Sequence, residues 1–327
     1  MNTTEERTDL TLFNEKIQQL RQEISTVIIG QTQAVDLLLT AILANGHVLI
    51  EGMPGVAKTL LARLISRLID ARFSRIQFTP DLMPSDVLGT TIFNVKTSEF
   101  DFHKGPVFAD IILVDEINRA PAKTQAALFE VMEERQVTID GITHKMGELY
   151  TILATQNPIE QEGTYPLPEA QVDRFMLKVV IDYPSIEEEK LIIRENLQSG
   201  LPQVKPVVSS EEILKARDVV RQVYIDEKIE QYIADIVFAT RYPDRYGLAD
   251  MKDLISFGGS PRASINLAKA ARAYAFIKRR GYVVPEDVRA VAHDVLRHRI
   301  GLSYEAEAMN VTSEELISKI INKVEVP

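Results

Sequence analysis

The sequence contains no cysteine, and this absence excludes three kinds of site at once. Without thiols the chain has no disulfides, no thiolate metal ligands and no cysteine nucleophile. Histidines are few, and His293 and His298 are five positions apart on a predicted helix, which is not the i,i+4 spacing of paired metal ligands. No Ser/His/Asp arrangement has motif context around it, so a hydrolase with a protein nucleophile is not supported.

Long hydrophobic runs are also missing, although 45% of the residues are hydrophobic. No apolar run reaches the roughly eighteen residues that a membrane-spanning helix needs. Residues 1–7 are polar and acidic, whereas a signal peptide begins with a basic segment followed by an apolar one. We therefore expect a soluble, cytoplasmic protein with no segment inserted in a membrane.

Basic residues are in the minority, since 37 Lys and Arg face 47 Asp and Glu for a net charge of −10. No basic block is present, so the charge does not support a general nucleic-acid footprint. A basic pore lined by a few residues of an oligomer is still compatible with this balance. The densest basic cluster, 278–280, precedes Gly281 and is expected to be a solvated helix end favoured by the helix dipole.

A phosphate-binding loop is predicted at residues 52–59, between the apolar run 47–50 and a helix-forming stretch at 60–68. Glycine lets backbone N–H groups turn toward a phosphate, and a helix N-terminus favours negative charge. The lysine of such a loop supplies a cation, and the hydroxyl after it is a Mg²⁺ ligand. Ala57 stands where the general pattern G-x-x-x-x-G-K-[ST] has its last glycine, which lowers the specificity of the match. The predicted nucleotide contacts are Gly52, Met53, Pro54, Gly55, Val56, Ala57, Lys58, Thr59 and Leu60, with Thr59 also a ligand of Mg²⁺.

The remaining strands of a sheet are predicted at four further apolar runs, 73–78, 111–114, 149–154 and 176–181. These runs alternate with helical or loop segments, which indicates a mainly parallel sheet with helices on both faces. Two amphipathic helices are expected before the loop, because apolar residues recur there every three to four positions. The sequence therefore predicts an α/β fold with five strands.

Two insertions are expected in this fold. The stretch 79–108 is too long for a simple connection and is predicted to contain a hairpin and a short helix of its own. A second hairpin is predicted at about 136–146, where Asp140-Gly141 separates two short strand-like runs.

The chain is long for one hydrophobic core, so two domains are expected. After Pro184 the pattern changes to helices without strands, with start signals such as Ser209-x-x-Glu212. We place the α/β domain at 1–206 and a helical domain at 207–327, with a hinge at 202–206.

Two carboxylates follow the apolar run 111–114. Asp115 and Glu116 are thereby expected at the carboxyl edge of the sheet, where open α/β sheets bind ligands. Asp115 can hold Mg²⁺ through water while Glu116 polarises an attacking water. Acidic residues also end strands as solvated caps, so the pattern gains weight only downstream of a phosphate loop. Asn157 ends the next strand and could orient the water or contact the γ-phosphate; the alternative is a turn-forming Asn before Pro158.

Two arginines are candidates for sensing phosphate. Arg174 precedes a strand, and an arginine offered there to a neighbouring subunit's γ-phosphate would accelerate hydrolysis by roughly 10³–10⁵. The alternative is a solubilising surface charge. Arg262 lies in the first turn of a helix that begins at Ser260-Pro261, where the dipole disfavours a cation, so an anionic partner is expected. The charged helix end 130–135 is expected to be a solvated face.

Five motifs together resemble the MoxR family of AAA+ ATPases, and the resemblance spans nearly the whole chain. It implies a P-loop NTPase domain of the AAA+ type with a C-terminal all-α lid, and it turns Ala57 into a family mark. The two predicted insertions are similar to the helix-2 insert and the pre-sensor-1 hairpin shared with magnesium chelatase AAA+ subunits. The motifs are Gly52-x-Pro54-Gly55-x-Ala57-Lys58-Thr59, Val114-Asp115-Glu116-x-Asn118-Arg119-Ala120, Thr155-Gln156-Asn157-Pro158, Asp173-Arg174-Phe175 and Ser260-Pro261-Arg262.

The resemblance also implies roles for single residues. Asn157 corresponds to sensor 1, Arg174 to the arginine finger and Arg262 to sensor 2. Arg119 would either face a neighbour's nucleotide or hold the subunit interface together, and Arg174 is ranked above it as the trans arginine. The adenine-contacting segment corresponds to Ile28, Ile29 and Gly30.

The function that the resemblance implies is Mg²⁺-dependent ATP hydrolysis in a ring, a hexamer by family likeness. Such a ring would act as a chaperone-like motor on a protein client, with a von Willebrand A-domain partner. The alternative is an ATP-gated switch that presents its hairpins to that partner and uses turnover only to reset. DNA translocation ranks third because of the acidic balance.

Overall fold

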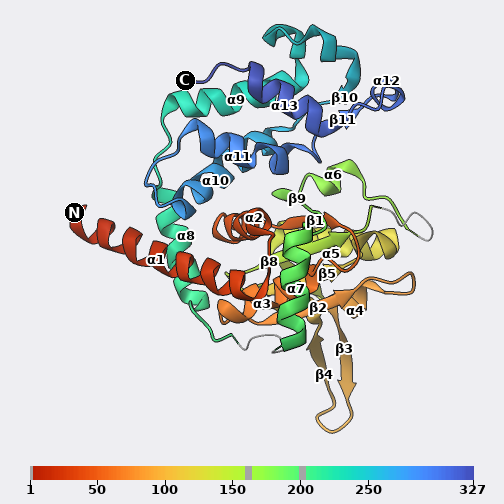
Figure 1. Ribbon diagram of the computed structural model, residues 1–327. Coiled ribbons are helices and arrows are strands. Elements are labelled where there is room, and N and C mark those ends of the chain that lie inside the picture. The colour runs from red at the N-terminus through yellow and green to blue at the C-terminus, as the bar shows by residue number, and fades with distance from the viewer. Residues whose placement is uncertain (1–2, 159–163, 199–203) are drawn as a thin grey trace.

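The computed structural model describes residues 3–158, 164–198 and 204–327. Its centre is a five-stranded sheet with the order β2-β5-β8-β1-β9, in which every neighbouring pair is parallel. Every residue of the inner strand β5 is buried, as expected for a parallel sheet covered on both faces. The predicted α/β fold is thus confirmed (Figure 1). The strands are β1 (Val48–Gly52), β2 (Phe73–Gln77), β5 (Ile111–Asp115), β8 (Thr151–Gln156) and β9 (Leu177–Ile181).

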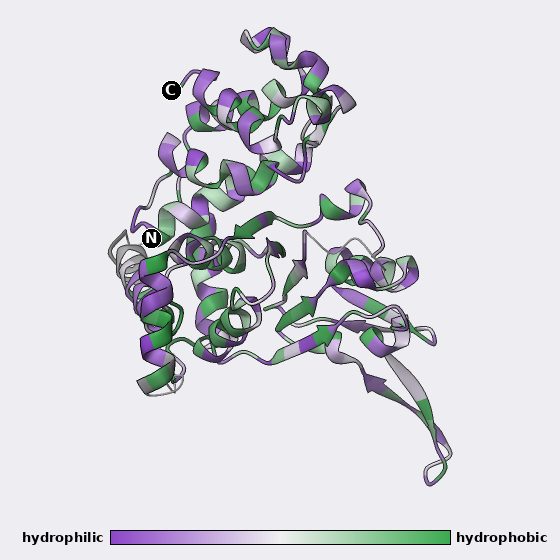
Figure 2. Cartoon of the chain, turned by 45° about the vertical axis from the view of Figure 1, so that its right-hand side comes forward, coloured by the Kyte–Doolittle hydropathy of each residue, from purple (hydrophilic) through white to green (hydrophobic). Residues whose placement is uncertain are grey.

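Alternate residues of the strands enter two different cores. Along β5, Ile111 and Leu113 belong to one hydrophobic cluster, whereas Ile112 and Val114 belong to the other. The first cluster continues through the helices before and after the loop into the C-terminal helices, and the second lies under a single long helix and the first insertion. Figure 2 shows the hydrophobic colouring along these central strands. The helices that flank the sheet are α1 (Thr3–Val27), α2 (Thr32–Leu43), α3 (Lys58–Leu68) and α5 (Ala122–Glu134).

Two hairpins leave the sheet between its strands. The first, β3–β4, projects far from the body of the molecule in both views (Figures 1 and 2). In the second, β6–β7, Asp140 and Gly141 have φ of 51° and 78°, the left-handed pair that a two-residue hairpin turn requires. The elements of these insertions are α4 (Pro84–Leu88), β3 (Gly89–Asn94), β4 (Glu99–Lys104), η1 (Pro106–Phe108), β6 (Gln136–Ile139) and β7 (Ile142–Lys145).

The C-terminal region is helical, as expected, with one difference. A two-stranded antiparallel ribbon, β10–β11, interrupts the predicted run of helices. Its strands are only three and two residues long, too short to give a sequence period. The expected hinge lies partly outside the described residues. The elements are α7 (Ile186–Gln198), α8 (Ser210–Gln222), α9 (Glu227–Arg241), η3 (Pro243–Tyr246), η4 (Ala249–Leu254), β10 (Ile255–Phe257), α10 (Pro261–Ile277), α11 (Pro285–Leu296), β11 (Gly301–Leu302), α12 (Tyr304–Ala308) and α13 (Ser313–Lys323).

The basic cluster at the end of α10 is not the solvated end that the sequence predicted. The Lys278 ammonium pairs with the buried Asp36 of α2 at 3.0 Å, and Arg280 pairs with the buried Asp287 of α11. The left-handed residue that closes the helix is Arg279, with φ of 62°, rather than Gly281. These cations therefore join the C-terminal helices to one another and to the sheet domain.

Within the described residues, no helix is long and apolar enough to cross a membrane.

Candidate nucleotide site

The predicted phosphate loop connects β1 directly to α3. Gly55 has φ of +86°, and a Cβ added there would meet nothing within 4 Å, so its backbone faces open space. Ala57 is also left-handed, with φ of 60°, and precedes the first residue of α3. The Lys58 ammonium folds back over the loop and donates to the carbonyl of Gly52 at 2.6 Å. The loop therefore combines a cation, a helix N-terminus and an open position at Gly55, which suits a phosphate.

Asp115 lies at the carboxyl end of β5, between the neighbouring strands β2 and β8, and is 7% exposed. Arg75 of β2 donates its Nε to one carboxylate oxygen at 2.6 Å, and the Thr155 hydroxyl of β8 donates to the other at 3.2 Å. Both contacts join neighbouring strands whose register the sheet fixes. Sequence reasoning missed Arg75, because its ion pair depends on the strand order β2-β5.

Glu116 follows Asp115 in a left-handed conformation, with φ of 57°. A non-glycine residue in this region is strained by about 1–3 kcal/mol, and such strain clusters at functional sites. Gln77 donates to the Glu116 carboxylate at 2.9 Å, and the guanidinium of Arg119 pairs with it at 3.1 Å. Arg119 thus contacts the carboxylate of its own chain. Asn157 follows β8, whose Gln156 lies opposite Glu51 near the end of β1, so it belongs to the same edge of the sheet.

The segment predicted to contact adenine, 28–30, is tied to this edge as well. Gln31, which follows it, donates to the carbonyl of Asp182 just after β9 at 2.9 Å. Gly30 has φ of +73°, and a Cβ there would lie 2.5 Å from the Glu188 carboxylate. A hollow of about 400 Å³ opens beside the segment between α1 and α2. Its lining includes Ile28, Gly30, Thr32, Asp36 and Arg279.

Arg174 and Arg262 lie at the opposite ends of the strands, the amino edge of the sheet. The amide of Met176 donates to the carbonyl of His47, and Leu177 pairs with Val48, so the turn that carries Arg174 lies beside the start of β1. The loop leaves from the other end of this five-residue strand. At about 3.3 Å per residue, the strand separates the phosphate loop from the turn that carries Arg174 by roughly 16 Å.

Glu133, near the end of α5, brings the two arginines together. Its carboxylate accepts a hydrogen bond from Arg262 Nη2 at 2.6 Å and lies 3.8 Å from Arg174 Nε. Arg174 also donates to the carbonyl of Phe129 at 2.6 Å. The expectation of a solvated face at 130–135 is therefore wrong for Glu133, whose partners are separated from it by 41 and 129 positions in the chain.

His47 is buried at this second edge of the sheet. Its Nδ1 accepts a hydrogen bond from the amide of Ile152 at 3.0 Å, and its Nε2 donates to the carbonyl of Met132 at 3.2 Å. Burial, with a smaller contribution from the charge of Arg135, lowers the pKa of His47 to about 3. The imidazole is therefore neutral at pH 7 and has a structural role.

The residues at the loop edge fit a magnesium nucleotide. Mg²⁺ prefers oxygen ligands and is commonly held by one or two protein groups together with substrate phosphates and water. Thr59 supplies a hydroxyl in the first turn of α3, and Asp115 supplies a buried carboxylate that already accepts a cationic partner, Arg75. Among the described residues, no group of three or more His, Cys, Asp or Glu side chains could hold a metal ion by itself.

Comparison with known proteins agrees with this geometry. The model of the ATPase family associated with various cellular activities (AAA) matches residues 47–177, and an AAA lid domain matches 249–320. The chain is 47% identical to Chaperone MoxR1 of Mycobacterium tuberculosis over 93% of this chain and 81% of that protein. This chain belongs to the MoxR family of AAA+ ATPases. Membership in this family implies that the chain binds a nucleotide.

Other relatives extend the match. Protein MoxR of Paracoccus denitrificans is 31% identical over 86% of this chain and 87% of its own length. YeaC of Bacillus subtilis is 44% identical over 94% and 93%, respectively. A crystal structure from Cytophaga hutchinsonii superimposes with a TM-score of 0.93 at 46% identity and covers 98% of both chains. The same fold therefore extends over 98% of the chain.

Proposed function

We propose that this MoxR-family protein hydrolyses ATP with Mg²⁺ at composite sites between the subunits of a ring. At the loop edge, Lys58 neutralises charge on the β- and γ-phosphates and Thr59 and Asp115 hold Mg²⁺. The ion, when bound, offsets the negative charge that develops during phosphoryl transfer. Glu116 accepts the proton of the attacking water, and Asn157 orients that water.

One observation carries the proposal of a composite site: Arg174 and Arg262 meet on Glu133 at the edge of the sheet opposite the loop. Neither arginine is positioned for the phosphate that its own Lys58 would bind. An arginine that contacts another subunit's γ-phosphate must lie on a different side of its own subunit from the phosphate loop. We infer that both arginines act in trans.

A chain with its loop on one edge and its arginines on the other associates head to tail. Such a heterologous interface closes into a ring when the rotation between subunits allows it. We propose a hexamer on the basis of the family resemblance, in the cytoplasm. Each subunit would then bind one nucleotide with its loop and complete its neighbour's site with its arginines.

The ring is proposed to act on a protein client, as the name of the Mycobacterium relative, Chaperone MoxR1, suggests. Support comes from the β3–β4 hairpin, where Val95 and Phe100 are 81% and 73% exposed. Exposed apolar side chains on a projecting hairpin are available to a partner. A von Willebrand A-domain protein is our proposed partner, and a slow ATP-gated switch is the alternative use of the same surface.

Glu116→Gln tests the assignment of the catalytic carboxylate. The amide keeps the shape of the side chain but does not accept the proton, so we expect ATP to bind normally and turnover to fall by roughly 10²–10⁴. Binding of a fluorescent ATP analogue and steady-state phosphate release measure the two quantities. Unchanged hydrolysis would refute the role of Glu116.

The choice between motor and switch needs a different measurement. Hydrolysis is measured with and without a candidate von Willebrand A-domain protein, and binding of that protein is measured with wild type and Glu116→Gln in ATP. Client-stimulated turnover supports a motor. A switch is supported if the partner binds only with ATP, binds wild type and Glu116→Gln equally well, and does not stimulate turnover.

A further inference from the structure

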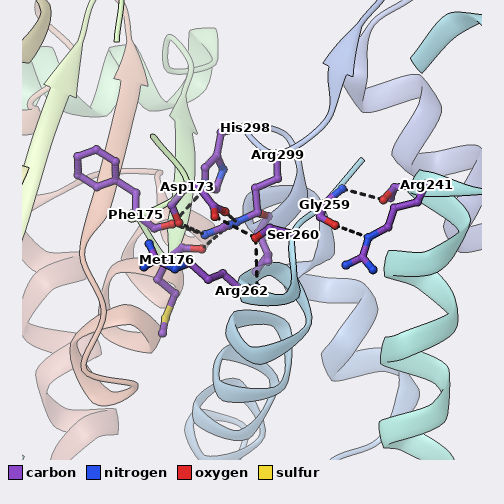
Figure 3. A network of polar contacts seen from close by, with 11 residues as sticks. Asp173, Phe175, Met176, Arg241, Gly259, Ser260, Arg262, His298 and Arg299 are labelled. Carbon is purple, nitrogen blue, oxygen red and sulfur yellow. Dashed lines mark hydrogen bonds and ion pairs between the residues drawn. The ribbon is translucent and has the colours of Figure 1, made fainter. Parts of the chain in front are cut away.

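A buried arginine that no motif includes lies beneath both trans arginines. Arg299 follows α11, and its side chain is 1% exposed. Its guanidinium donates Nε to the Asp173 carboxylate at 2.7 Å and Nη2 to the carbonyls of Asp173 and Phe175 at 2.9 and 2.5 Å. Nη1 donates to the carbonyl of Met176 at 3.2 Å and to that of Val295. Arg299 therefore bonds to three of the four residues of the turn 173–176, namely Asp173, Phe175 and Met176 (Figure 3).

The cost of burying a charge explains why the Arg299 guanidinium has so many hydrogen-bond partners. A buried guanidinium is tolerated only when its donors are satisfied, since its desolvation costs several kcal/mol. Here the fork of Arg299 finds one carboxylate and four carbonyls. A lysine would keep the charge but has a single nitrogen, so it does not reproduce this set of directions. The shape of the guanidinium, rather than its charge alone, fixes the turn.

Asp173 passes this constraint on to α10. Its second carboxylate oxygen accepts a hydrogen bond from the Ser260 hydroxyl at 2.9 Å, and the Ser260 oxygen in turn accepts one from the amide of Arg262 at 3.1 Å. Ser260 is the N-cap of α10, so its position sets where the helix begins. Gly259 is held on α9 by Arg241, which donates to its carbonyl at 2.6 Å (Figure 3).

The two ends of this network carry the two arginines of the composite site. Arg174 is next to Asp173, and Arg262 lies two residues after Ser260. The Arg174 side chain is 30% exposed and the Arg262 side chain is 45% exposed, and both contact Glu133. Arg299 is thus a buried residue that connects, through Asp173 and Ser260, to two exposed cations from different domains.

We propose that Arg299 is a positioning residue that, through Asp173 and Ser260, fixes Arg174 and Arg262 as one two-arginine unit for the neighbouring subunit's γ-phosphate. The proposal rests on the composite site of the proposed function. Misplacement of a catalytic group by about 1 Å can cost roughly 10²-fold in rate. Arg299 never contacts the nucleotide in this scheme, and its loss acts on the neighbour's site rather than on its own.

Arg299→Lys tests the proposal most directly. We expect kcat of ATP hydrolysis to fall about ten- to a hundredfold, because both arginines lose their fixed spacing. ATP binding to the variant's own loop should stay within about twofold, since the loop lies at the other edge of the sheet. Steady-state kinetics and nucleotide titration give the two values. A fall in ATP affinity with an unchanged kcat would overturn the proposal.

Arg297→Lys is the matched control. Arg297 is also an inward-facing lid arginine, 12% exposed in its side chain, and it pairs with Asp294 at 2.8 Å and Glu314 at 2.6 Å. It also donates to the carbonyl of Lys178, so it joins the lid to β9 without contacting 173–176 or Ser260. A general weakening of the lid would affect both variants alike. We expect Arg297→Lys to keep kcat within about threefold, and an equal loss in both would overturn the proposal.

Mixing subunits separates positioning in trans from an effect on the chain's own site. Arg299→Lys and Glu116→Gln subunits should recover activity when combined, since the first supplies the intact Glu116 and the second the intact arginine pair. Arg174→Ala mixed with Glu116→Gln is the reference. Recovery in the reference mixture alone would refute the role of Arg299 and leave the composite site standing. Recovery in neither would refute the composite site itself.

Ser260→Ala and Ser260→Thr keep the proposal testable if Arg299→Lys does not fold. Alanine removes the link from Asp173 to α10, whereas threonine retains the hydroxyl. We expect kcat to fall several-fold in Ser260→Ala and to stay near wild type in Ser260→Thr, with ATP binding unchanged in both. A Ser260→Ala protein with wild-type kcat would contradict the relay.

Discussion

The two edges of the sheet are built in different ways. At the loop edge, Asp115 ends a strand, and Glu116 and Asn157 each follow one directly. The contacts of Asp115 with Arg75 and Thr155 come from neighbouring strands in register. At the arginine edge, the contact between Arg262 and Glu133 spans 129 positions, and that between Arg299 and Asp173 spans 126. The loop edge is thus fixed by backbone geometry, and the arginine edge by side chains that cross between domains.

This difference has a functional consequence. The phosphate loop is positioned by the strand and the helix on either side of it, β1 and α3. The arginine pair depends on the docking of α10 and α11 against the turn 173–176. A movement of the lid would therefore change the arginine edge and, in the ring that we propose, the site of the neighbouring subunit.

The largest effects are expected from substituting one residue at each edge. Lys58→Ala should abolish tight ATP binding, because the loop loses its cation. Arg174→Ala should keep ATP binding and lose roughly 10³–10⁵ in turnover, the contribution of a trans arginine. Nucleotide titration and phosphate release on both variants check the prediction. Loss of ATP binding in Arg174→Ala would contradict the separation of the edges.

The second-largest effect is expected from acid, which should lower the free energy of unfolding through His47 at the arginine edge. The unfolded chain protonates His47 near pH 6.5, whereas the folded protein keeps it neutral down to its pKa of about 3. Its contribution to stability is therefore full above pH 6.5 and is lost as the pH falls from there toward 3. The free energy of unfolding should decrease by about 1.4 kcal/mol per pH unit in that window from this one group.

Urea unfolding between pH 7 and pH 5 measures this slope. His47→Gln should make it shallower, and His103→Gln, on the exposed strand β4, should leave it unchanged. An identical slope in wild type and His47→Gln would mean that His47 does not carry the effect. Desolvation also lowers the pKa of His298, which contacts the carbonyl of Phe175, so a residual slope is expected in His47→Gln.

The smallest effect is expected from Arg75, whose side chain is 46% exposed. Its guanidinium competes with a metal ion for Asp115, so Arg75→Gln should lower the Mg²⁺ concentration needed for half-maximal ATP binding. An exposed ion pair contributes up to about 1 kcal/mol, which limits the shift to about fivefold. Arg72→Gln, which loses the similar pair with Asp110 at the other end of these strands, is the control. A higher Mg²⁺ requirement in Arg75→Gln would contradict the prediction.

The same difference between the edges determines how much the sequence could predict. The strands, the loop and the Asp115-Glu116 pair are local patterns, and the structure has them where the apolar runs and glycines indicated. Local patterns did not reveal Gln77 and Arg75, because their partners depend on strand order. The ribbon β10–β11 was missed because two such short strands have no period.

The arginine edge was predicted in its residues but not in its arrangement. An unfavourable position at a helix start indicated that Arg262 needs an anion, and the structure gives it Glu133. Glu133 itself had been interpreted as a solvated charge, since nothing near it in the sequence carries its partners. Arg299 had no signal at all, because a single arginine after a helix is ordinary until its burial is known.

The central claim is that each ATP site is shared between two subunits, and mixing inactive subunits tests it most directly. Arg174→Ala and Glu116→Gln proteins are each measured alone and in an equimolar mixture. If subunits mix at random around a ring, half of the loops times half of the arginine edges gives about a quarter of the wild-type hydrolysis. We predict this recovery. A mixture no more active than its two components would contradict the account.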